Sequence, residues 1–174
     1  MDPRLQELLD QQAITRLLAE YAHACDRCDT ERMASVYWAD SWDDHGVTQA
    51  PGPEFARLMS RQIIPASCET LSHLLGQSLI NIDGDSAGAE TYYIAVTRDT
   101  TAEGEPRCNQ LGGRYIDRLE RRGGEWRIRH RTCVRDWSMS LRLEEDHFAH
   151  AELKLGQRSG EDLSYPVLGW QHRA

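Results

Sequence analysis

The chain lacks any long hydrophobic run. No apolar stretch approaches the ~20 residues that a helix needs to span a bilayer, and residues 1–12 are acidic and amphipathic, unlike a secretory signal peptide. We therefore expect no membrane partner and a cytoplasmic location. The 5 cysteines are odd in number and irregularly spaced, which favours reduced thiols over a disulfide framework.

The chain also lacks an excess of positive charge. Of its 174 residues, 20 are Lys or Arg and 28 are Asp or Glu, so the net charge is -8. Nucleic-acid phosphates require clustered Lys and Arg, and an acidic chain argues against such a partner. The basic residues between Arg118 and Arg131 alternate with apolar and acidic residues. We interpret them as the solvated face of a hairpin.

Sequence motifs for cofactors and activated nucleophiles are missing as well. The pairs Gly112-Gly113 and Gly123-Gly124 form neither a GxGxxG nor a P-loop pattern. No Ser-centred nucleophile elbow is found. The length and composition are those of one ordinary globular domain with a real core. We expect no cofactor.

Two groups of neighbouring residues are of the types found in metal or redox sites. Cys25 and Cys28 form a CxxC pair, but zinc would need two more ligands, and a redox pair favours a helix N-terminus rather than a helix end. Asp43-Asp44-His45, with His23, could imitate a metal-binding cluster. We interpret the carboxylates as surface groups beside a turn, and expect no metal.

The elements that are present run from helices to strands. Apolar spacing predicts a long helix over 4–26, a second over 30–38 that buries Met33, Val36 and Tyr37, and a third over 54–64 that Pro65 ends. Four strands follow, at 70–82, 87–98, 107–119 and 125–137. Helices followed by an antiparallel meander indicate an α+β domain whose sheet curves around the long helix and leaves a cone-shaped cavity.

Two polar side chains are predicted to meet in this apolar interior. Asp26 follows Ala22 by four residues and Leu18 by eight, so it lies on the apolar side of its helix. Burial and the negative end of the helix dipole both disfavour a carboxylate there. His73 stands alone in an apolar strand. A nearby imidazole or Arg would offset the cost at Asp26, and an Asp–His pair in a pocket suggests proton transfer.

The chain resembles the NTF2-like, SnoaL-like superfamily over about residues 5–138. The features that carry the resemblance are Tyr21 and Asp26 at the end of the first helix, His73 in LSHLLG, Asp83-Gly-Asp85 with Glu90-Thr-Tyr92, GGRYIDRL, and GEWRI followed by Arg131. The resemblance implies a cone-shaped curved antiparallel sheet wrapped around the long N-terminal helix. In the cofactor-free lyases of the family an Asp–His pair supplies the base, with Tyr and Arg assisting; here these would be Asp26, His73, Tyr21 and Arg131.

The orientation of Arg131 depends on strand alternation. If Ile128 points inward, strict alternation turns Arg131 outward, and only a β-bulge brings it back to the cavity. Without a bulge, His130 would be the pocket residue. We keep both as candidates. Other candidate substrate-binding residues are Trp42, His45, Tyr92 and Tyr115.

The function implied is a cofactor-independent lyase, of the dehydratase or a related isomerase or C–C cleavage type, on a small apolar aromatic or alicyclic molecule. Three plainer readings stay open: a core role for His73, a structural ion pair between Asp26 and Arg131, and a binding or assembly module without chemistry. Residues 1–138 would form the domain. The tail, 139–174, with a short helix at 146–154, would cover the pocket or a subunit interface. We expect a homo-oligomer, with a trimer first and a dimer second.

Overall fold

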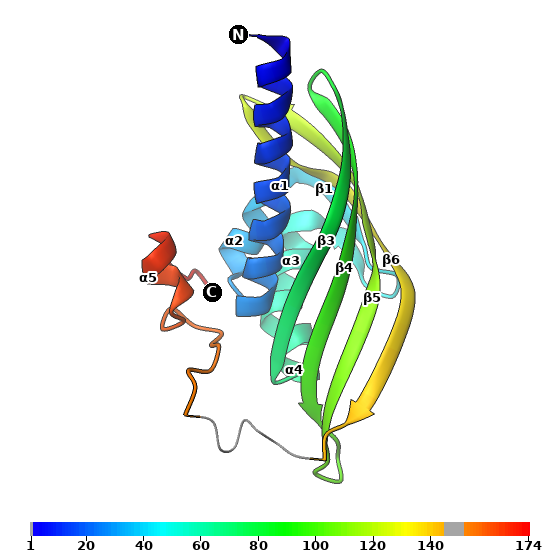
Figure 1. Ribbon diagram of the computed structural model, residues 1–174, viewed down its shortest axis with the longest axis vertical. Helices are drawn as coiled ribbons and strands as arrows, with labels where there is room; N and C mark the ends of the chain where they lie inside the picture. The colour runs from blue at the N-terminus through cyan, green and yellow to red at the C-terminus, as the bar shows by residue number, and fades with distance from the viewer. Residues whose placement is uncertain (1, 145–151) are drawn as a thin grey trace.

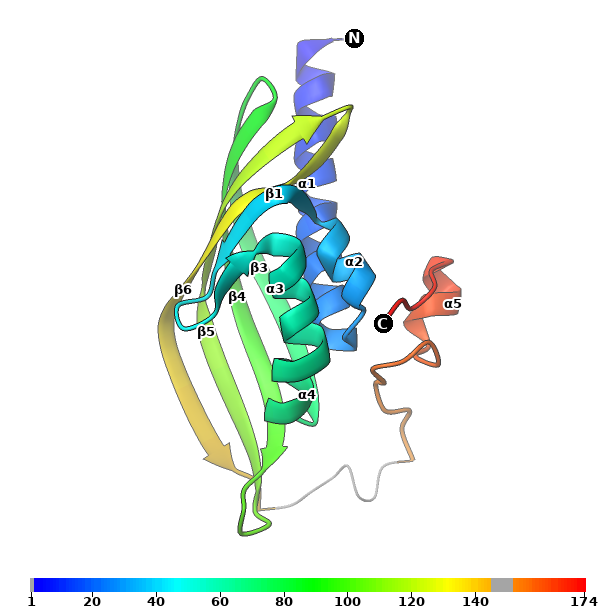
Figure 2. The same ribbon diagram turned by 180° about the vertical axis from the view of Figure 1, so that it is seen from behind.

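The structure is a computed structural model that describes residues 2–144 and 152–174. One curved sheet forms a single layer, and the helices lie against one face of it (Figure 1). The long helix α1, Pro3–Arg27, runs along this face and belongs to the same layer as the shorter helices (Figure 2). The predicted α+β fold, with a curved sheet on a long N-terminal helix, is confirmed.

Local signals at both ends define α1. The Asp2 carboxylate caps the first turn by accepting the Arg4 backbone N–H at 2.9 Å, and Pro3 stands at the first position, where a missing N–H costs nothing. The helix ends at Cys28, which adopts the left-handed conformation with φ 52° and donates its N–H to the carbonyls of Ala24 and Cys25. The predicted helix over 4–26 agrees to within one residue at each end.

The second predicted helix is shorter than expected. Helix α2, Thr30–Ser35, is capped by Asp29, and strand β1 already begins at Tyr37 and runs to Asp44. Tyr37 is buried as predicted, but it is a strand residue whose hydroxyl donates to Asp43 at 2.6 Å. The pattern over 30–38 does not reveal the strand, because β1 depends on pairing with residues about ninety positions later in the chain.

Pro65 does not end the third helix. After strand β2, Gln49–Pro51, helix α3 covers Gly52–Leu58, a π-helical turn η1 covers Met59–Ile63, and α4 continues over Ile64–Ser67. In the wider π turn the Ile64 N–H bonds to the Met59 carbonyl. A proline inside an α-helix clashes with the carbonyl four residues earlier, and the wider turn relieves this crowding.

Within the part of the chain that the structure describes, the sheet has six strands rather than the predicted four. The strands β3 (Thr70–Asp83), β4 (Ser86–Thr100), β5 (Pro106–Arg122) and β6 (Glu125–Arg142) form the expected antiparallel meander. The full order is β2-β1-β6-β5-β4-β3, and β1 pairs parallel with β6. The strand β6 continues past residue 137, where the sequence pattern predicts its end.

Small side chains make room for α1 on the concave face. The β4 residues Ala87, Ala89 and Ala95 are buried there, and α1 contributes Ile14, Leu18 and other buried side chains to the same core. Near its beginning, the helix is tied to the sheet by Asp10, which accepts hydrogen bonds from Trp126 Nε1 and Arg121 Nη1, each at 2.9 Å. The core and the polar contacts together fix the position of α1 over the sheet.

Two irregularities in the β5–β6 pairing reset the alternation of β6. Arg118 pairs with His130 and Leu119 with Ile128, so Arg129 is an extra residue. Gly112 pairs with Trp137 and Gly113 with Arg135, so Asp136 is a second extra residue. A β-bulge of this kind returns the next residues to the opposite face. A Cβ on Gly113 would lie 2.0 Å from the Val134 carbonyl oxygen, so this close approach requires glycine.

The C-terminal segment returns to the helices of its own chain. Helix α5, Ser164–Leu168, packs near the end of α1, where the buried Tyr165 donates to Asp29 at 3.2 Å and His23 contacts Ser164 at 3.0 Å. Figure 1 shows this segment beside α1 and α2, on the side away from the sheet. Most of the predicted helix at 146–154 lies outside the described residues, and 152–154 are not helical.

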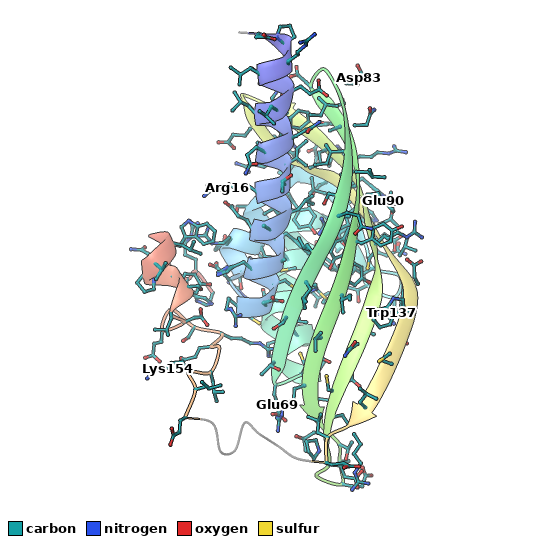
Figure 3. All side chains as sticks on the ribbon, in the orientation of Figure 1. Arg16, Glu69, Asp83, Glu90, Trp137 and Lys154 are labelled. Carbon is teal, nitrogen blue, oxygen red and sulfur yellow. The ribbon has the colours of Figure 1, made fainter. Side chains whose placement is uncertain are left out.

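The outer face of the sheet is rich in exposed apolar side chains. Figure 3 shows Trp137 and Glu90 on the side of the sheet away from α1. Tyr92, Ile94 and Ile116 are also partly exposed. The homo-oligomer stays a prediction. Among the described residues, no helix is both long and apolar enough to cross a membrane.

Candidate active site

Asp26 and His73 form a hydrogen-bonded pair. The end of α1 presents the buried Asp26 carboxylate to β3, where Oδ1 lies 2.6 Å from His73 Nδ1. The other oxygen, Oδ2, accepts the backbone N–H of His73 at 2.9 Å. An ionised carboxylate can only accept, so Nδ1 carries the proton of the neutral ring and Nε2 carries the lone pair. The pair therefore has the arrangement of an oriented base.

His73 lines a cavity of about 180 Å³ between the helices and the concave face of the sheet. Apolar protein cavities of about 150 Å³ accept a benzene ring, so this space suits a molecule built on a single ring. Carbon and sulfur atoms dominate the wall, with a few polar groups among them. The lining residues are Tyr21, Cys25, His45, Met59, Ile64, Ser67, Cys68, Leu71, His73, Tyr93, Ala95, Thr97, Leu111, Tyr115, Cys133 and Arg135.

Arg131 points inward but lies behind the cavity wall. The bulge at Arg129 turns it to the concave face, where it is 0% exposed and forms two 2.7 Å bonds with the Asp117 carboxylate. Its guanidinium lies 4.1 Å from the centroid of Tyr21 and 4.2 Å from that of Tyr115. The ion-pair partner of Arg131 is thus Asp117 and not Asp26. Arg131 supports the two rings that face the cavity.

Tyr21 and Tyr115 are fully buried and pack edge to face at 5.6 Å between centroids. Burial raises the pKa of both hydroxyls well above the usual value of 10.0, so both stay protonated at neutral pH. The Tyr115 ring also stacks on Tyr93 at 4.4 Å. These rings make the cavity floor rigid and leave hydroxyl groups that can donate hydrogen bonds.

A second imidazole also lies near Tyr115. His45 follows β1, stacks on Phe55 at 4.6 Å between centroids, and forms a very short hydrogen bond through Nδ1 with the fully buried Asp43. The centroids of His45 and His73 lie 6.1 and 6.5 Å from that of Tyr115. Burial favours the neutral ring, but the bonds to Asp43 and then Cys133 raise the pKa of His45 to about 9. His45 is therefore an imidazolium at neutral pH.

Asp43 corrects the sequence interpretation of its segment. It is 0% exposed and accepts from both Tyr37 and His45, so it is not a surface carboxylate. His23 lies apart from this group, against Tyr165. Within residues 2–144 and 152–174, no three His, Cys, Asp or Glu side chains are arranged to hold a metal ion.

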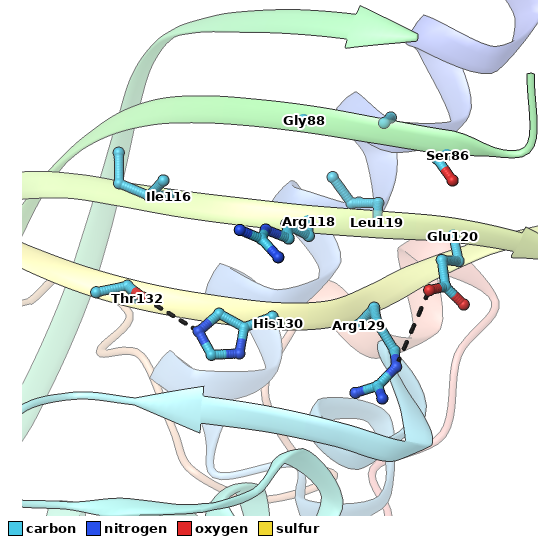
Figure 4. A pocket seen from close by; sticks show the side chains of 10 residues that line it. Ser86, Gly88, Ile116, Arg118, Leu119, Glu120, Arg129, His130 and Thr132 are labelled. Carbon is cyan, nitrogen blue, oxygen red and sulfur yellow. Dashed lines mark hydrogen bonds and ion pairs between the residues drawn. The ribbon is translucent and has the colours of Figure 1, made fainter. Parts of the chain in front are cut away.

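Three predicted lining residues lie on the opposite face of the sheet. Trp42, Tyr92 and His130 alternate with inward neighbours and point outward, and Trp42 pairs directly with His130. Figure 4 shows His130 among the residues that line an outer concavity, with its ring directed at Thr132. The concavity has a volume of about 760 Å³, and His130 Nε2 lies 3.3 Å from the Thr132 hydroxyl. Although this concavity is larger, the inner cavity holds both carboxylate-bound imidazoles, and we take it as the candidate site.

Sequence reasoning missed Cys133, Tyr93 and the role of Asp43. The spacing Asp43-x-His45 carries a usable signal, since residues two apart in a strand share one face. Cys133 gives no such signal, because its inward direction follows from the bulge at Arg129. The CxxC thiols behave differently from a redox pair: burial raises the pKa of both Cys25 and Cys28.

The comparisons with known proteins agree with this architecture. The model of the SnoaL-like domain matches residues 6–132, which is most of the chain, and the chain belongs to this family. Among curated proteins, none matches the sequence.

Solved structures share the fold at low sequence identity. A hexachlorocyclohexane dehydrochlorinase is 17% identical, with a TM-score of 0.72 over 88% of this chain and 97% of that one. A scytalone dehydratase candidate from Novosphingobium aromaticivorans is 19% identical, with a TM-score of 0.67 over 76% and 88%. A protein of unknown function from Mycobacterium tuberculosis is 25% identical, with a TM-score of 0.66 over 78% and 77%. The first two likenesses show the fold alone.

Proposed function

We propose that the protein is a cofactor-independent lyase that removes water, or a comparable leaving group, from a small cyclic molecule by proton abstraction from carbon. The observation that carries the proposal is the Asp26–His73 pair at the cavity wall, with 2.6 Å between Oδ1 and Nδ1. The dehydratase candidate and the dehydrochlorinase among the structural relatives carry names of eliminating enzymes, which supports the same class.

His73 is the proposed base. Its Nε2 takes a proton from the carbon next to a carbonyl group, and the ring becomes an imidazolium. Asp26 fixes the ring orientation and stabilises the charge that forms, as the carboxylate of a Ser-His-Asp triad does. A positioned base of this kind contributes ~10²–10⁴ in rate.

His45 is the proposed acid. It is protonated at neutral pH because Asp43 holds its charge despite burial, and its ring, like that of the base, lies near Tyr115. It can protonate the departing hydroxyl while His73 takes the proton from carbon. Tyr21 lines the same cavity, and its hydroxyl is the second candidate donor. Arg131 is proposed as a positioning residue, since its guanidinium is engaged by Asp117.

The proposed substrate class is a β-hydroxy ketone on one six-membered ring. The cavity volume of about 180 Å³ limits the size of the molecule, and the mostly apolar wall favours an uncharged ring. The carbonyl group makes the adjacent C–H acidic, and a hydroxyl on the next carbon can then leave. The predicted homo-oligomer, trimer first, is part of the same proposal.

The test is elimination of water from 3-hydroxycyclohexanone, followed by the absorbance of the 2-cyclohexenone formed. We expect turnover by the wild type, a loss of ~10²–10⁴ in kcat for His73→Ala, and a large loss for Asp26→Asn. His130→Ala is the matched control, because this histidine lies on the outer face, and it should retain full turnover. Equal turnover by the wild type and His73→Ala would overturn the base assignment. Binding without turnover of this or related one-ring ketones would favour a binding module.

A further inference from the structure

We propose that Cys133 is a second reactive group of this cavity, a nucleophilic thiolate that adds reversibly to α,β-unsaturated carbonyl compounds. This reaction forms a bond to sulfur, which the elimination proposed above does not require. His45 has a role in both proposals, but Cys133 is not part of the Asp26–His73 pair, so alkylation of Cys133 tests this proposal apart from elimination.

The geometry around Cys133 is that of an activated nucleophile. The Cys133 thiol lines the cavity from β6 together with His45, whose positive charge acts on the sulfur and whose Nδ1 is held by Asp43. The Tyr93 hydroxyl lies 3.2 Å from the sulfur. The order of groups is thus a nucleophile (Cys133), an imidazole (His45) and an orienting carboxylate (Asp43). Phe55 stacks on the imidazole and fixes its plane. This order of groups recurs where thiols and hydroxyls serve as nucleophiles.

Every element around the sulfur contributes to its charge state. His45 faces it after β1, Tyr93 from β4, Tyr115 from β5 and Arg131 from β6. Burial alone would raise the pKa of Cys133, but the bond to His45, its positive charge, Tyr93 and then Arg131 lower it.

A neighbouring thiol shows the opposite behaviour. Cys25 lines the same cavity, and burial raises its pKa well above the usual value. Burial and access to the cavity therefore do not explain a reactive thiolate at Cys133. The positive charge of His45 next to the sulfur explains it.

The properties of the cavity indicate which electrophile the Cys133 thiolate would attack. A thiolate in an apolar cavity is suited to a polarised carbon–carbon double bond of one small ring. Sulfur forms a C–S bond to the β carbon, the electron pair of the double bond moves toward the carbonyl as an enolate, and His45 supplies the proton that the enolate takes at the α carbon. Reversal restores the thiolate, the imidazolium and the alkene, and no oxidant or reductant is needed. The alkene left by elimination from a β-hydroxy ketone belongs to this class of compound.

The test is the rate at which each cysteine is alkylated by N-ethylmaleimide, a cyclic unsaturated carbonyl, read by mass spectrometry of peptides. At pH 6.5 Cys133 should react at least tenfold faster than Cys25 and Cys68, which line the same cavity. The alkylation rate of an ordinary thiol falls about tenfold per pH unit below its pKa of about 8.5, whereas the Cys133 rate should fall less steeply between pH 8 and 6.5. An excess of 2-cyclohexenone should slow the labelling and be removable by dialysis.

Two variants assign the activation to His45. His45→Gln and Asp43→Asn should each slow the alkylation of Cys133 at pH 6.5, by at least tenfold for the first, with circular dichroism as the check of folding. Labelling of Cys133 no faster than that of Cys25 and Cys68, or an ordinary thiol pH profile in the wild type, would overturn the proposal even if a variant fails to fold. Because these rates do not depend on elimination, failure of the proposed lyase activity would leave them unchanged.

Discussion

Asp26 binds His73 through both oxygens of its carboxylate. One oxygen holds the ring nitrogen Nδ1 at 2.6 Å, and the other holds the backbone N–H of the same residue at 2.9 Å. The helix end thus fixes both the imidazole and the strand that carries it. A buried carboxylate needs such partners to offset the loss of water, and the same bonds orient Nε2. Stability and the chemistry we propose depend on one contact.

The first prediction concerns Arg131 and Asp117. Both are buried and joined by two 2.7 Å bonds. Arg131→Met should lower the free energy of unfolding by about 3–5 kcal/mol, because it leaves an unpaired buried carboxylate. The double variant Arg131→Met, Asp117→Leu should lose much less than the sum of the two single variants in urea denaturation. Additive losses would show that the pair is not coupled.

The second prediction concerns stability at alkaline pH. The pKa of His45 rises from its usual 6.5 to about 9 on folding, so between these values the folded state holds a proton that the unfolded state lacks. Its contribution is complete below pH 6.5 and is lost as the pH rises through 9. The pKa of Cys133 is lowered on folding, so its contribution has the opposite sign and is present at high pH.

The two contributions have opposite signs and partly offset each other in the wild type. Cys133→Ser removes one of them, and because Asp43 still raises the pKa of His45, the unfolding free energy of this variant should fall more than that of the wild type as the pH rises from 6.5 to 9. Adding His45→Gln to Cys133→Ser should abolish that fall. Urea titrations at several pH values measure it; a wild type as pH-dependent as Cys133→Ser would argue against the thiolate–imidazolium pair.

The third prediction concerns the C-terminal segment. The Asp162 carboxylate is desolvated by burial, yet the backbone N–H of Gln157 and then Ser164 lower its pKa to about 2. Its contribution is present above the usual 3.8 and is lost as the pH falls toward 2. Asp162→Asn should lose about 1 kcal/mol of this local stability at neutral pH. Hydrogen exchange of the amides in 157–174 should then quicken several-fold while those of α1 stay unchanged.

The sequence predicts the parts of the fold that depend on local pattern. The spacing of apolar residues is sufficient for α1 and for the four long strands. It does not predict that β1 begins at Tyr37, because the pairing of β1 with β6 joins distant residues. It also does not predict that the helix continues through Pro65, where a π turn accommodates the proline. Neither the pairing of distant strands nor a π turn clearly alters the spacing of apolar residues along the sequence.

The site was predicted where a residue's face follows from its own element. Asp26 lies on the apolar side of α1, and His73 lies in an apolar strand, so their meeting could be expected. Trp42, Tyr92 and His130 were assigned to the wrong face because aromatic character does not reveal strand alternation. The direction of Arg131 and Cys133 depends on one bulge at Arg129, which is visible only in the pairing of β5 with β6.

The central claim is that His73 abstracts a proton from carbon, and hydrogen–deuterium exchange of cyclohexanone in heavy water tests this step without any leaving group. We predict that the wild type accelerates exchange at the carbons next to the carbonyl, that His130→Ala does so equally, and that His73→Ala and Asp26→Asn lose most of the acceleration. Exchange catalysed as well by His73→Ala as by the wild type would contradict the account.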